Sequence, residues 1–276
     1  MNTSRPLDLP SSRLPAGKEP LVSCLMVTRN RVKLAQRAVQ CFMDQTWSHK
    51  QLVIVDDGEE SYAPLVGACR ARGFDVLYHR VATEPRLTLG ALRNVAIEQS
   101  DGAFLAQWDD DEWYAPERLT MQLQALINEG TRACVLKWTL MHLDTPAFTH
   151  HPYRADVGRG TPGTIVHQRS EIRYPALRIA EDSVFLDAHR PLGVSILGRE
   201  ASHLFIRCFH GSNTWDANHF LRRLRRTPRD MIHFGLARLR GDILRHPAFA
   251  LEAREASAVS RFREDSAAVG LLRSGA

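Results

Sequence analysis

The sequence of 276 residues contains no apolar run that approaches the roughly 20 residues a helix needs to cross a bilayer. Its first 20 residues are polar and rich in proline, and they lack the apolar core of a signal peptide. These two absences argue against a membrane-spanning protein and against export. We therefore predict a loose N-terminal tail over residues 1–20 and a cytoplasmic location.

Motifs built on cysteine or glycine are also missing. The five cysteines are scattered and form no Cys-x-x-Cys pair, which argues against zinc and disulfide frameworks and predicts core thiols in a reducing compartment. No Gly-x-Gly-x-x-Gly follows the first apolar run, and no Gly-x-x-x-x-Gly-Lys-Ser/Thr occurs. The sequence therefore gives poor support to a dinucleotide-binding enzyme or a P-loop NTPase.

Positive charge is concentrated near the C-terminus. The net charge is +5, and residues 217–276 contain twelve Arg against six Asp or Glu. We predict that 217–276 form a basic helical extension interrupted at Pro228 and Pro247. Phe220, Leu221 and Leu224 follow helical spacing with arginines around them, which favours peripheral contact with the inner face of an anionic membrane, or a homodimer contact. Nucleic acid is not expected, because aromatic residues for base stacking are missing there.

Strands alternate with helices through the first half of the chain. Apolar runs of strand length occupy residues 21–27, 51–55, 76–78 and 103–108. Apolar residues at helical spacing occupy 32–44, 62–72, 89–99 and 116–128. This order predicts the α/β class, with an open and mostly parallel sheet flanked by helices. Ligands of such sheets bind beyond the carboxyl ends of the strands.

The pattern is weaker after residue 129. We predict a strand over 133–141, a long segment of His, Pro, Gly and Arg over 142–163, and a strand over 164–167. A helix follows from 180, then a strand over 203–207 and a loop over 210–215. Long irregular segments in compact domains often form lids or binding loops. We therefore expect one domain over 21–216, with a ligand-binding half over 21–128 and a second half over 129–216.

Acidic clusters follow two of the predicted strands. Asp56 and Asp57 come after the second strand, and Asp109, Asp110 and Asp111 come after the fourth. Three adjacent carboxylates are costly without a positive partner, and a hard divalent cation that holds phosphates is a common solution. An acidic turn that caps the next helix is the alternative. If the chain stays extended, Asp109 and Asp111 point the same way.

Four elements in this order resemble family 2 of the glycosyltransferases, which are inverting enzymes with the GT-A fold. They are the strand and loop over 22–31, Val-Asp-Asp-Gly at 55–58, Leu-Arg-Asn-Val-Ala at 92–96 with Ser-Asp-Gly at 100–102, and the triple Asp at 109–111 with Pro-Glu-Arg-Leu at 116–119. The resemblance covers residues 20–128 best and is thin afterwards. The Gln-x-x-Arg-Trp sequence of processive synthases is absent, which favours transfer of a single sugar.

The resemblance implies donor contacts for several residues. Asp57, with Asp56, matches the acid that binds the nucleotide base, although an Asp-Gly turn is an alternative. Thr28 and Arg31 match the loop that faces the base and ribose, or form an ordinary solvated loop. Arg93 matches a position that reaches the diphosphate, for which a guanidinium is well suited.

The resemblance also implies a metal and a base. Asp109 and Asp111 match the Asp-x-Asp motif that binds Mn²⁺ or Mg²⁺ and ribose, Asp110 is hard to exclude, and His210 resembles a late metal-ligating His. Asp182 matches the catalytic base, with Glu181 beside it, while both could instead cap a helix. Trp113 and Trp215 could stack on a sugar or belong to the core. His150 and His151 are adjacent and so do not favour a joint zinc site.

The function that the resemblance implies is metal-dependent, inverting transfer of one sugar. The donor is a nucleotide-diphospho-sugar, most readily a UDP-sugar, and the acceptor is a saccharide or a lipid-linked hydroxyl in the synthesis of surface polysaccharide, lipopolysaccharide or glycolipid. Two alternatives stay open. One is a non-catalytic nucleotide- or carbohydrate-binding module of the same fold. The other is a sugar nucleotidyltransferase, which the absence of glycine from residues 25–31 disfavours.

Overall fold

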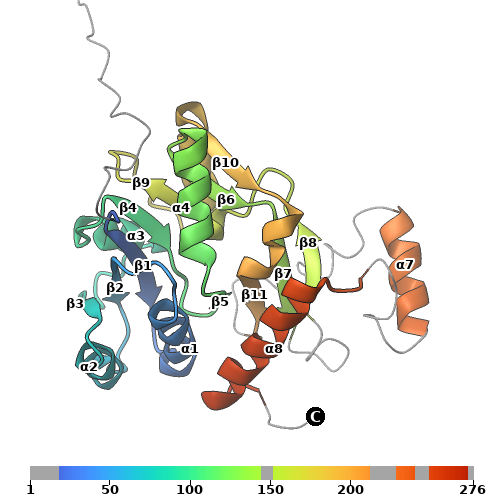
Figure 1. Cartoon of the computed structure of the whole chain (residues 1–276). Helices are drawn as coiled ribbons and strands as arrows, with labels where there is room; N and C mark the ends of the chain where they lie inside the picture. The colour runs from blue at the N-terminus through green and yellow to red at the C-terminus, as the bar shows by residue number, and fades with distance from the viewer. Residues whose placement is uncertain (1–18, 144–151, 212–227, 240–248, 273–276) are drawn as a thin grey trace, which may run out of the picture.

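The computed structural model describes residues 19–143, 152–211, 228–239 and 249–272. A seven-stranded sheet runs through the molecule in the order β10-β6-β9-β4-β1-β2-β3 (Figure 1). Its strands are β1 Val22–Thr28, β2 Lys50–Asp56, β3 Asp75–Arg80, β4 Phe104–Gln107, β6 Ala133–Leu136, β9 Val166–Gln168 and β10 Val194–Leu197. Neighbours pair in parallel except β9, which is antiparallel to β4 and to β6. The predicted fold class is confirmed.

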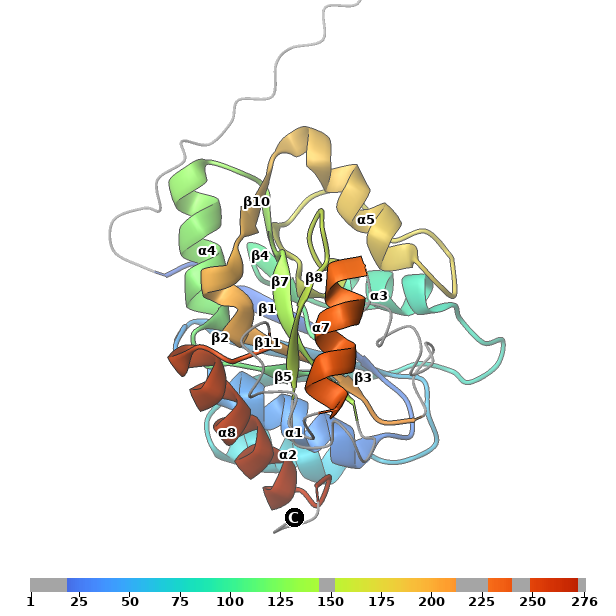
Figure 2. The ribbon, with the colours of Figure 1, turned by 90° about the vertical axis from the view of Figure 1, so that its right-hand side faces the viewer.

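Helices cover both faces of this sheet. The first helices are α1 Val32–Met43, α2 Ala63–Ala71, α3 Leu89–Glu98, α4 Arg118–Glu129 and α5 Glu181–His189 (Figure 2). In β1, Cys24 and Met26 pack in a cluster with residues of α1, α2 and α4, whereas Leu25 packs in another with residues of α3 and α5. Alternate side chains of a strand point to opposite faces, so β1 is buried on both. Its near-continuous apolar sequence follows from that position.

A second sheet of four strands has the order β5-β11-β7-β8. Its strands are β5 Trp113–Tyr114, β7 Trp138–Leu143, β8 Tyr153–Asp156 and β11 Phe205–Phe209. The prediction of one strand over 133–141 is wrong, because β6 belongs to the large sheet and β7 to the small one. Lys137 lies between them, where the chain leaves one sheet for the other. Apolar residues lie on both sides of Lys137 because both strands are buried.

Several other short elements were missed. The described residues of the segment 142–163 contain the end of β7, all of β8 and the start of a 3-10 turn at Pro162–Thr164. β5 and β10 have two and four residues, which is too short for a periodic pattern. The strand expected over 203–207 starts at Phe205, because a 3-10 helix occupies Arg199–Leu204. The prediction that the cysteines are core thiols is confirmed, since all five are free and buried.

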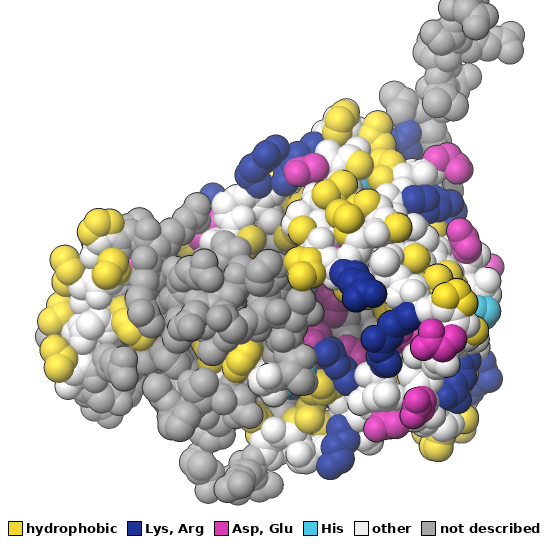
Figure 3. Space-filling model, turned by 180° about the vertical axis from the view of Figure 1, so that it is seen from behind, with side chains coloured by type: hydrophobic (Ala, Val, Ile, Leu, Met, Phe, Trp, Pro, Cys, Tyr) yellow, Lys and Arg dark blue, Asp and Glu magenta, His cyan; other side chains and the backbone are white. Residues whose placement is uncertain are grey.

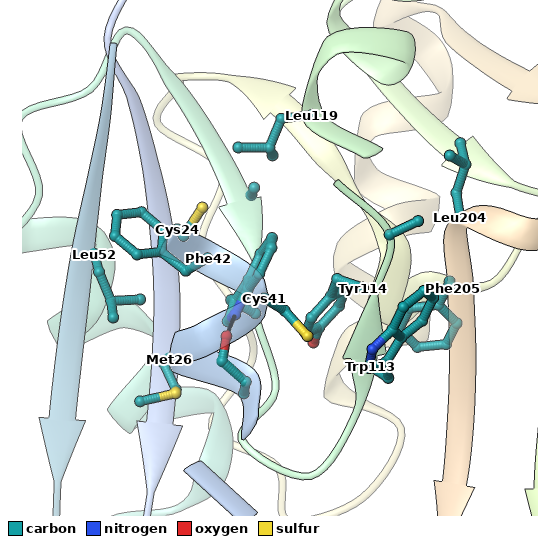
Figure 4. Packing of buried hydrophobic residues seen from close by; sticks show 14 of the residues in the cluster. Cys24, Met26, Cys41, Phe42, Leu52, Trp113, Tyr114, Leu119, Leu204 and Phe205 are labelled. Atoms are coloured by element: carbon teal, nitrogen blue, oxygen red, sulfur yellow. Dashed lines mark hydrogen bonds between the residues drawn. The ribbon is translucent and has the colours of Figure 1, made fainter. Parts of the chain in front are cut away.

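The two sheets meet in one aromatic core. Figure 4 shows Tyr114, Trp113 and Phe205 between the strand β1 with helix α1 on one side and Leu204 on the other. Trp108 stacks on Tyr114 with ring centroids 3.9 Å apart, and Tyr114 contacts the Phe205 ring at 5.5 Å. β5 pairs with β11 in antiparallel register, Phe205 opposite Tyr114. This packing fixes the second half of the chain to the segment that follows β4.

Two helices of the basic C-terminal region are described, α7 Pro228–Leu239 and α8 Ala253–Ala268. Pro228 begins α7, which suits a residue without a backbone N–H. Ala258, Val259 and Phe262 of α8 are buried in the same core cluster as Trp113 and Phe205. The predicted amphipathic segment with Phe220, Leu221 and Leu224 lies outside the described residues, as does Pro247. Within the described part of the chain, every helix is too short or too polar to cross a membrane.

Candidate active site

A cavity of about 190 Å³ opens at the carboxyl ends of β1 and β4. Among its lining residues, Asp109, Asp110 and Asp111 follow β4, Arg93 comes from α3, and Arg31 comes from the loop after β1. Glu181 and Asp182 from the start of α5 also line it. The structure therefore brings together the two halves of the predicted site. Figure 3 shows acidic side chains set back in a hollow, with Lys and Arg side chains around it (Figure 3).

The three aspartates reach this cavity because the chain turns. β4 ends at Gln107, and the last sheet hydrogen bond after it runs from the Trp108 N–H to the carbonyl of Leu25 at 3.0 Å. Asp110 and Asp111 lie in a turn, so the extended form on which the alternation argument depended does not persist. Asp109 and Asp111 nevertheless line the same cavity, and Asp110, which the sequence did not exclude, lines it too.

Asp110 is held against the end of β1. Its Oδ2 accepts a hydrogen bond from the Thr28 hydroxyl at 2.6 Å, and its Oδ1 lies 3.6 Å from the Arg31 guanidinium. Burial, together with the charge of Asp111, raises the pKa of Asp110 to about 8. The raised pKa means that the Asp110 carboxyl resists ionisation. Adjacent carboxylates behave in this way when too few positive charges lie near them.

Asp111 has the opposite electrostatic character. Arg31 donates to its Oδ2 at 3.2 Å, and the Nε2 of His210 lies 3.1 Å from the same oxygen. Burial acts to raise the pKa of Asp111, but the hydrogen bond with His210 and the charge of Arg31 outweigh it and lower that pKa. His210 follows β11, whose pairing with β7 and β5 brings it beside a residue 99 positions earlier.

Arg93 joins Asp109 to Glu181. One guanidinium nitrogen donates to Asp109 at 3.0 Å and the other to Glu181 at 2.8 Å. Its guanidinium also lies 5.3 Å from the ring centroid of Tyr174, and its side chain is only 10% exposed. Burial raises the pKa of Asp109 and of Glu181, and Arg93 opposes both shifts. Arg93 thus compensates two carboxylates from different halves of the chain.

Asp182 lies in the first turn of α5, next to Glu181. Its carboxylate accepts the N–H of Ser183 at 2.7 Å, which orients it at the rim of the cavity. Ala180 before it adopts the left-handed conformation, with φ of 64°, and so sets the direction in which the helix starts. The Asp182 carboxylate is thus held by the backbone of its own helix and also borders the cavity.

Asp56 and Asp57 lie at the end of β2, beside Thr28, but they are not among the lining residues of the cavity within the described chain. Asp56 accepts the N–H of Gly58 at 2.8 Å and the Tyr78 hydroxyl at 2.7 Å. Asp57 is 7% exposed, and burial raises its pKa. A Cβ on Gly58 would lie 2.5 Å from Asn30 Oδ1, so glycine allows the two loops to approach each other.

Three further charged residues of the cavity were not predicted as site residues. Arg178 precedes α5 in a segment without periodicity, so the sequence offers no signal for it. Arg207 lies in β11, and Glu112 directly follows the triple Asp. Because Glu112 directly follows that motif, its sequence position could have identified it. Its carboxylate accepts a hydrogen bond from the backbone N–H of Cys208 at 2.6 Å. This contact links the acidic turn to the strand before His210.

The donor set suits a hard divalent cation. Within the described residues, no group of three His, Cys, Asp or Glu side chains is arranged to hold a metal. Asp111 and His210 form a preassembled pair, and Asp109 and Asp110 lie beside it. Burial and the charge of Asp111 raise the pKa of Asp110 to about 8. Mg²⁺ commonly takes one or two carboxylates and completes its coordination with phosphates and water. The residues present therefore fit Mn²⁺ or Mg²⁺ shared with a phosphate ligand.

Three other candidates have different outcomes. Trp113 is fully buried, and its ring contacts Phe262 edge-on, so it belongs to the core rather than to a sugar-stacking surface. Trp215 lies outside the described residues, and so do His150 and His151.

The sequence model of the family described as "Glycosyl transferase family 2" matches residues 23–179. The chain belongs to this family. The match spans more than half of the chain and contains both acidic clusters and Arg93, which confirms the resemblance seen in the sequence. Glu181, Asp182 and His210 lie beyond its end, so their place in the site depends on the geometry described above.

One relative is the putative colanic acid biosynthesis glycosyl transferase WcaA of Escherichia coli K12. It is 32% identical over 113 residues, which cover 38% of this chain and 37% of WcaA. The alignment thus spans little more than a third of this relative's length.

Two solved structures share the fold. TarS residues 1–349 of S. aureus, in complex with UDP-GlcNAc, superposes with a TM-score of 0.55 at 16% identity over 91% of this chain and 73% of that one. The mannosyltransferase PcManGT of Pyrobaculum calidifontis, in complex with GDP-Man and Mn²⁺, gives 0.52 at 16% identity over 97% and 80%. The fold of this chain is therefore that of the GT-A glycosyltransferases.

Proposed function

We propose that this chain is a metal-dependent, inverting glycosyltransferase that moves one sugar from a nucleotide-diphospho-sugar to an acceptor hydroxyl. The observation that carries the proposal is the single cavity that contains the triple Asp, Arg31, Arg93 and Asp182 at the carboxyl ends of parallel strands. The solved relatives hold UDP-GlcNAc or GDP-Man on the same fold. Of these donor classes we propose a UDP-sugar.

In this proposal the donor lies across the ends of β1, β2 and β4. Asp57, supported by Asp56, binds the edge of the base, and Thr28 with Arg31 faces the base and ribose. Arg93 reaches the diphosphate, with Asp109 and Asp110 beside it at the ribose. The buried position of Asp57 beside the end of β1 supports this arrangement, since a carboxylate withdrawn from water forms strong hydrogen bonds with a ligand.

Asp111 is the proposed principal metal ligand, with Asp109 and His210 as further ligands. A bound Mn²⁺ or Mg²⁺ would stabilise the negative charge that develops on the leaving nucleoside diphosphate. Arg31 contacts Asp110 and Asp111 and lines the cavity, so its charge is available to the same phosphates. The 3.1 Å contact between Asp111 and His210 supports a shared role for these two residues.

Asp182 is the proposed base. The acceptor oxygen attacks the anomeric carbon from the face opposite the diphosphate, and its proton passes to the Asp182 carboxylate. The bond between the anomeric carbon and the phosphate oxygen breaks, and its electron pair leaves with the diphosphate. A single displacement inverts the configuration and needs no covalent intermediate. Glu181 is held by Arg93, so it positions the start of α5 beside the base.

We also propose that the acceptor is a saccharide or lipid-linked hydroxyl in polysaccharide synthesis at the inner face of the membrane, and that α7 contacts an anionic membrane. The name of WcaA, which refers to biosynthesis of colanic acid, supports an acceptor in polysaccharide synthesis.

The exposed side of α7 supports the membrane contact. Phe234 packs on the small sheet, while four large apolar side chains of α7 are exposed. Their exposed fractions are 56% for Met231, 62% for Ile232, 42% for Leu236 and 86% for Leu239.

Liposome flotation tests this contact. Binding to anionic but not to neutral vesicles, lost in the double variant Ile232→Ser, Leu239→Ser, would support it. These point variants are preferable to removal of residues 217–276, because that deletion would also take the core residue Phe262. Equal flotation of wild type and variant would overturn the role of α7.

Calorimetry with nucleotides tests the proposed function. UDP, GDP, CDP and ADP are each titrated with Mn²⁺, with Mg²⁺ and with EDTA into wild type and Asp111→Asn. We expect metal-dependent binding of UDP that Asp111→Asn abolishes, and slow hydrolysis of the matching donor sugar. Failure of every diphosphate to bind under any metal condition would overturn the proposal and favour a non-catalytic module of the same fold.

A further inference from the structure

The C-terminal helix α8 contacts the acidic turn of the candidate site from behind. Phe262 is fully buried in the core cluster, and its ring lies 6.4 Å from that of Trp113 in an edge-on arrangement. The Nε1 of Trp113 donates to Asp265 of α8 at 2.8 Å. These two residues are 152 positions apart, and α8 lies outside residues 23–179, to which the family model applies.

Arg37 of α1 makes a second connection between α8 and the turn. One guanidinium nitrogen donates to the backbone carbonyl of Asp111 at 2.7 Å, and the other donates to Ser266 Oγ at 3.1 Å. The guanidinium also lies 5.3 Å from the Phe262 ring. Arg37 is 3% exposed, so these contacts form away from water, where such hydrogen bonds are stronger.

α8 is itself anchored at a third place. Glu255 accepts hydrogen bonds from Arg154 of β8 and from the Ser202 hydroxyl, and its Oε2 accepts the backbone N–H of Glu252 in a capping box. In the middle of the helix, Arg261 pairs at 2.8 Å with Asp44, which directly follows α1. The helix is therefore fixed to β8 and to the end of α1 independently of its contacts with the turn.

We propose that α8 is a positioning element of the donor site, which acts through Asp265 on Trp113 and through Arg37 on the backbone of Asp111. The turn is held on both sides. Arg37 holds the Asp111 carbonyl behind it, while the Asp111 carboxylate points into the cavity towards Arg31 and His210. The inference rests on the proposed function, because it assigns Asp265 and Arg37 a role in metal-dependent donor binding.

The test compares pairs of variants at Asp265 and Trp113. Asp265→Ala removes the acceptor of the Trp113 N–H, whereas Asp265→Asn keeps an oxygen that can accept it. Trp113→Phe keeps a buried ring and removes the donor. Arg199→Ala serves as the control, because it breaks an exposed ion pair with Glu252 just before α8 and leaves the turn untouched. Each variant is titrated with UDP in Mn²⁺ and in EDTA, and its thermal midpoint is measured.

We expect Asp265→Ala and Trp113→Phe to weaken Mn²⁺-dependent UDP binding roughly ten-fold or more, since a misplacement of about 1 Å can cost about 100-fold in a site of this kind. Asp265→Asn and Arg199→Ala should bind like wild type, and binding in EDTA should change little in any variant.

The outcomes separate this inference from the proposed function. If wild type binds UDP with Mn²⁺ and the two damaging variants bind equally well, α8 has no positioning role and the inference is overturned. The inference is also overturned if the loss of UDP binding in each variant follows the fall in its thermal midpoint and Asp265→Asn shows the same loss. The role of Asp265 would then be purely structural. Failure of wild type to bind any diphosphate is the separate result that overturns the proposed function.

Discussion

The carboxylate of Glu181 lies 2.8 Å from the guanidinium of Arg93, and this ion pair joins the start of α5 to helix α3. Glu181 is 3% exposed, and Arg93 also holds Asp109, which belongs to the acidic turn. One buried cation therefore fixes the distance between the acidic turn and the element that carries Asp182. Glu181 and Asp182 both line the cavity, and Glu181 is paired there with Arg93.

The place of Asp182 in the cavity predicts that its removal affects turnover rather than nucleotide binding. Asp182→Asn should lower kcat about 10²–10⁴-fold, because a positioned proton acceptor contributes a factor of this size. The Kd for the nucleoside diphosphate should stay close to that of wild type. Turnover of a donor sugar and calorimetric titration measure the two quantities. Equal activity of Asp182→Asn and wild type would rule out Asp182 as the base.

Removal of Arg93 should destabilise the fold as well as the site. Arg93→Ala leaves two carboxylates without their buried partner, and the loss of one member of such a pair costs about 3 kcal/mol of unfolding free energy. Chemical denaturation of the variant measures this cost. The control is Arg190→Ala, whose partner Asp187 is 60% exposed, and which should cost less than about 1 kcal/mol. Similar losses in both variants would contradict the structural role given to Arg93.

The first half of the fold was predictable because its elements are long and regular. β1 and β2 are buried on both faces, which forces continuous apolar runs such as Val22–Thr28. Helices α1 and α4 present one apolar side, which gives the 3.6-residue period. The described strands of the second half have only three to six residues, and a strand as short as β10 leaves no recognisable period.

The site was predictable where its residues follow strands. Asp109 to Asp111 and Asp56 with Asp57 end β4 and β2, and parallel strands put such positions at one edge. Arg178 could not be found, because nothing local distinguishes it from a surface arginine. The hydrogen bond between Trp113 and Asp265 could not be predicted either. It depends on how α8 packs against a residue that lies 152 positions earlier in the sequence.

His210 should decide which metal the site prefers. Its Nε2 lies 3.1 Å from Asp111, and imidazole favours Mn²⁺ over the harder Mg²⁺. We expect His210→Ala to weaken Mn²⁺-supported UDP binding about ten-fold or more and to leave Mg²⁺-supported binding nearly unchanged, in line with the loss of one nitrogen ligand. Parallel titrations in the two metals measure the ratio. An unchanged ratio would remove His210 from the metal site.

A buried histidine pair should make the fold sensitive to acid. His167 is 2% exposed and its ring lies 4.7 Å from that of His189. Burial, together with His189, lowers the pKa of His167 from 6.5 to about 3. Between these two pH values the unfolded chain binds a proton that the folded chain excludes, so the unfolding free energy falls as the pH falls. Above pH 6.5 neither state is protonated there, and the contribution is complete.

The expected slope from His167 alone is about 1.4 kcal/mol of unfolding free energy per pH unit, from just below pH 6.5 downward. His189, whose pKa burial also lowers, adds to it. Denaturation with urea at pH 7.5, 6.0 and 5.0 measures the slope in wild type and in His167→Gln. The variant lacks the titrating ring, so its unfolding free energy should fall less between pH 7.5 and pH 5.0. This holds even if its unfolding free energy at pH 7.5 is lower than that of wild type. Parallel curves for the two proteins would mean that His167 already accepts its proton in the folded state.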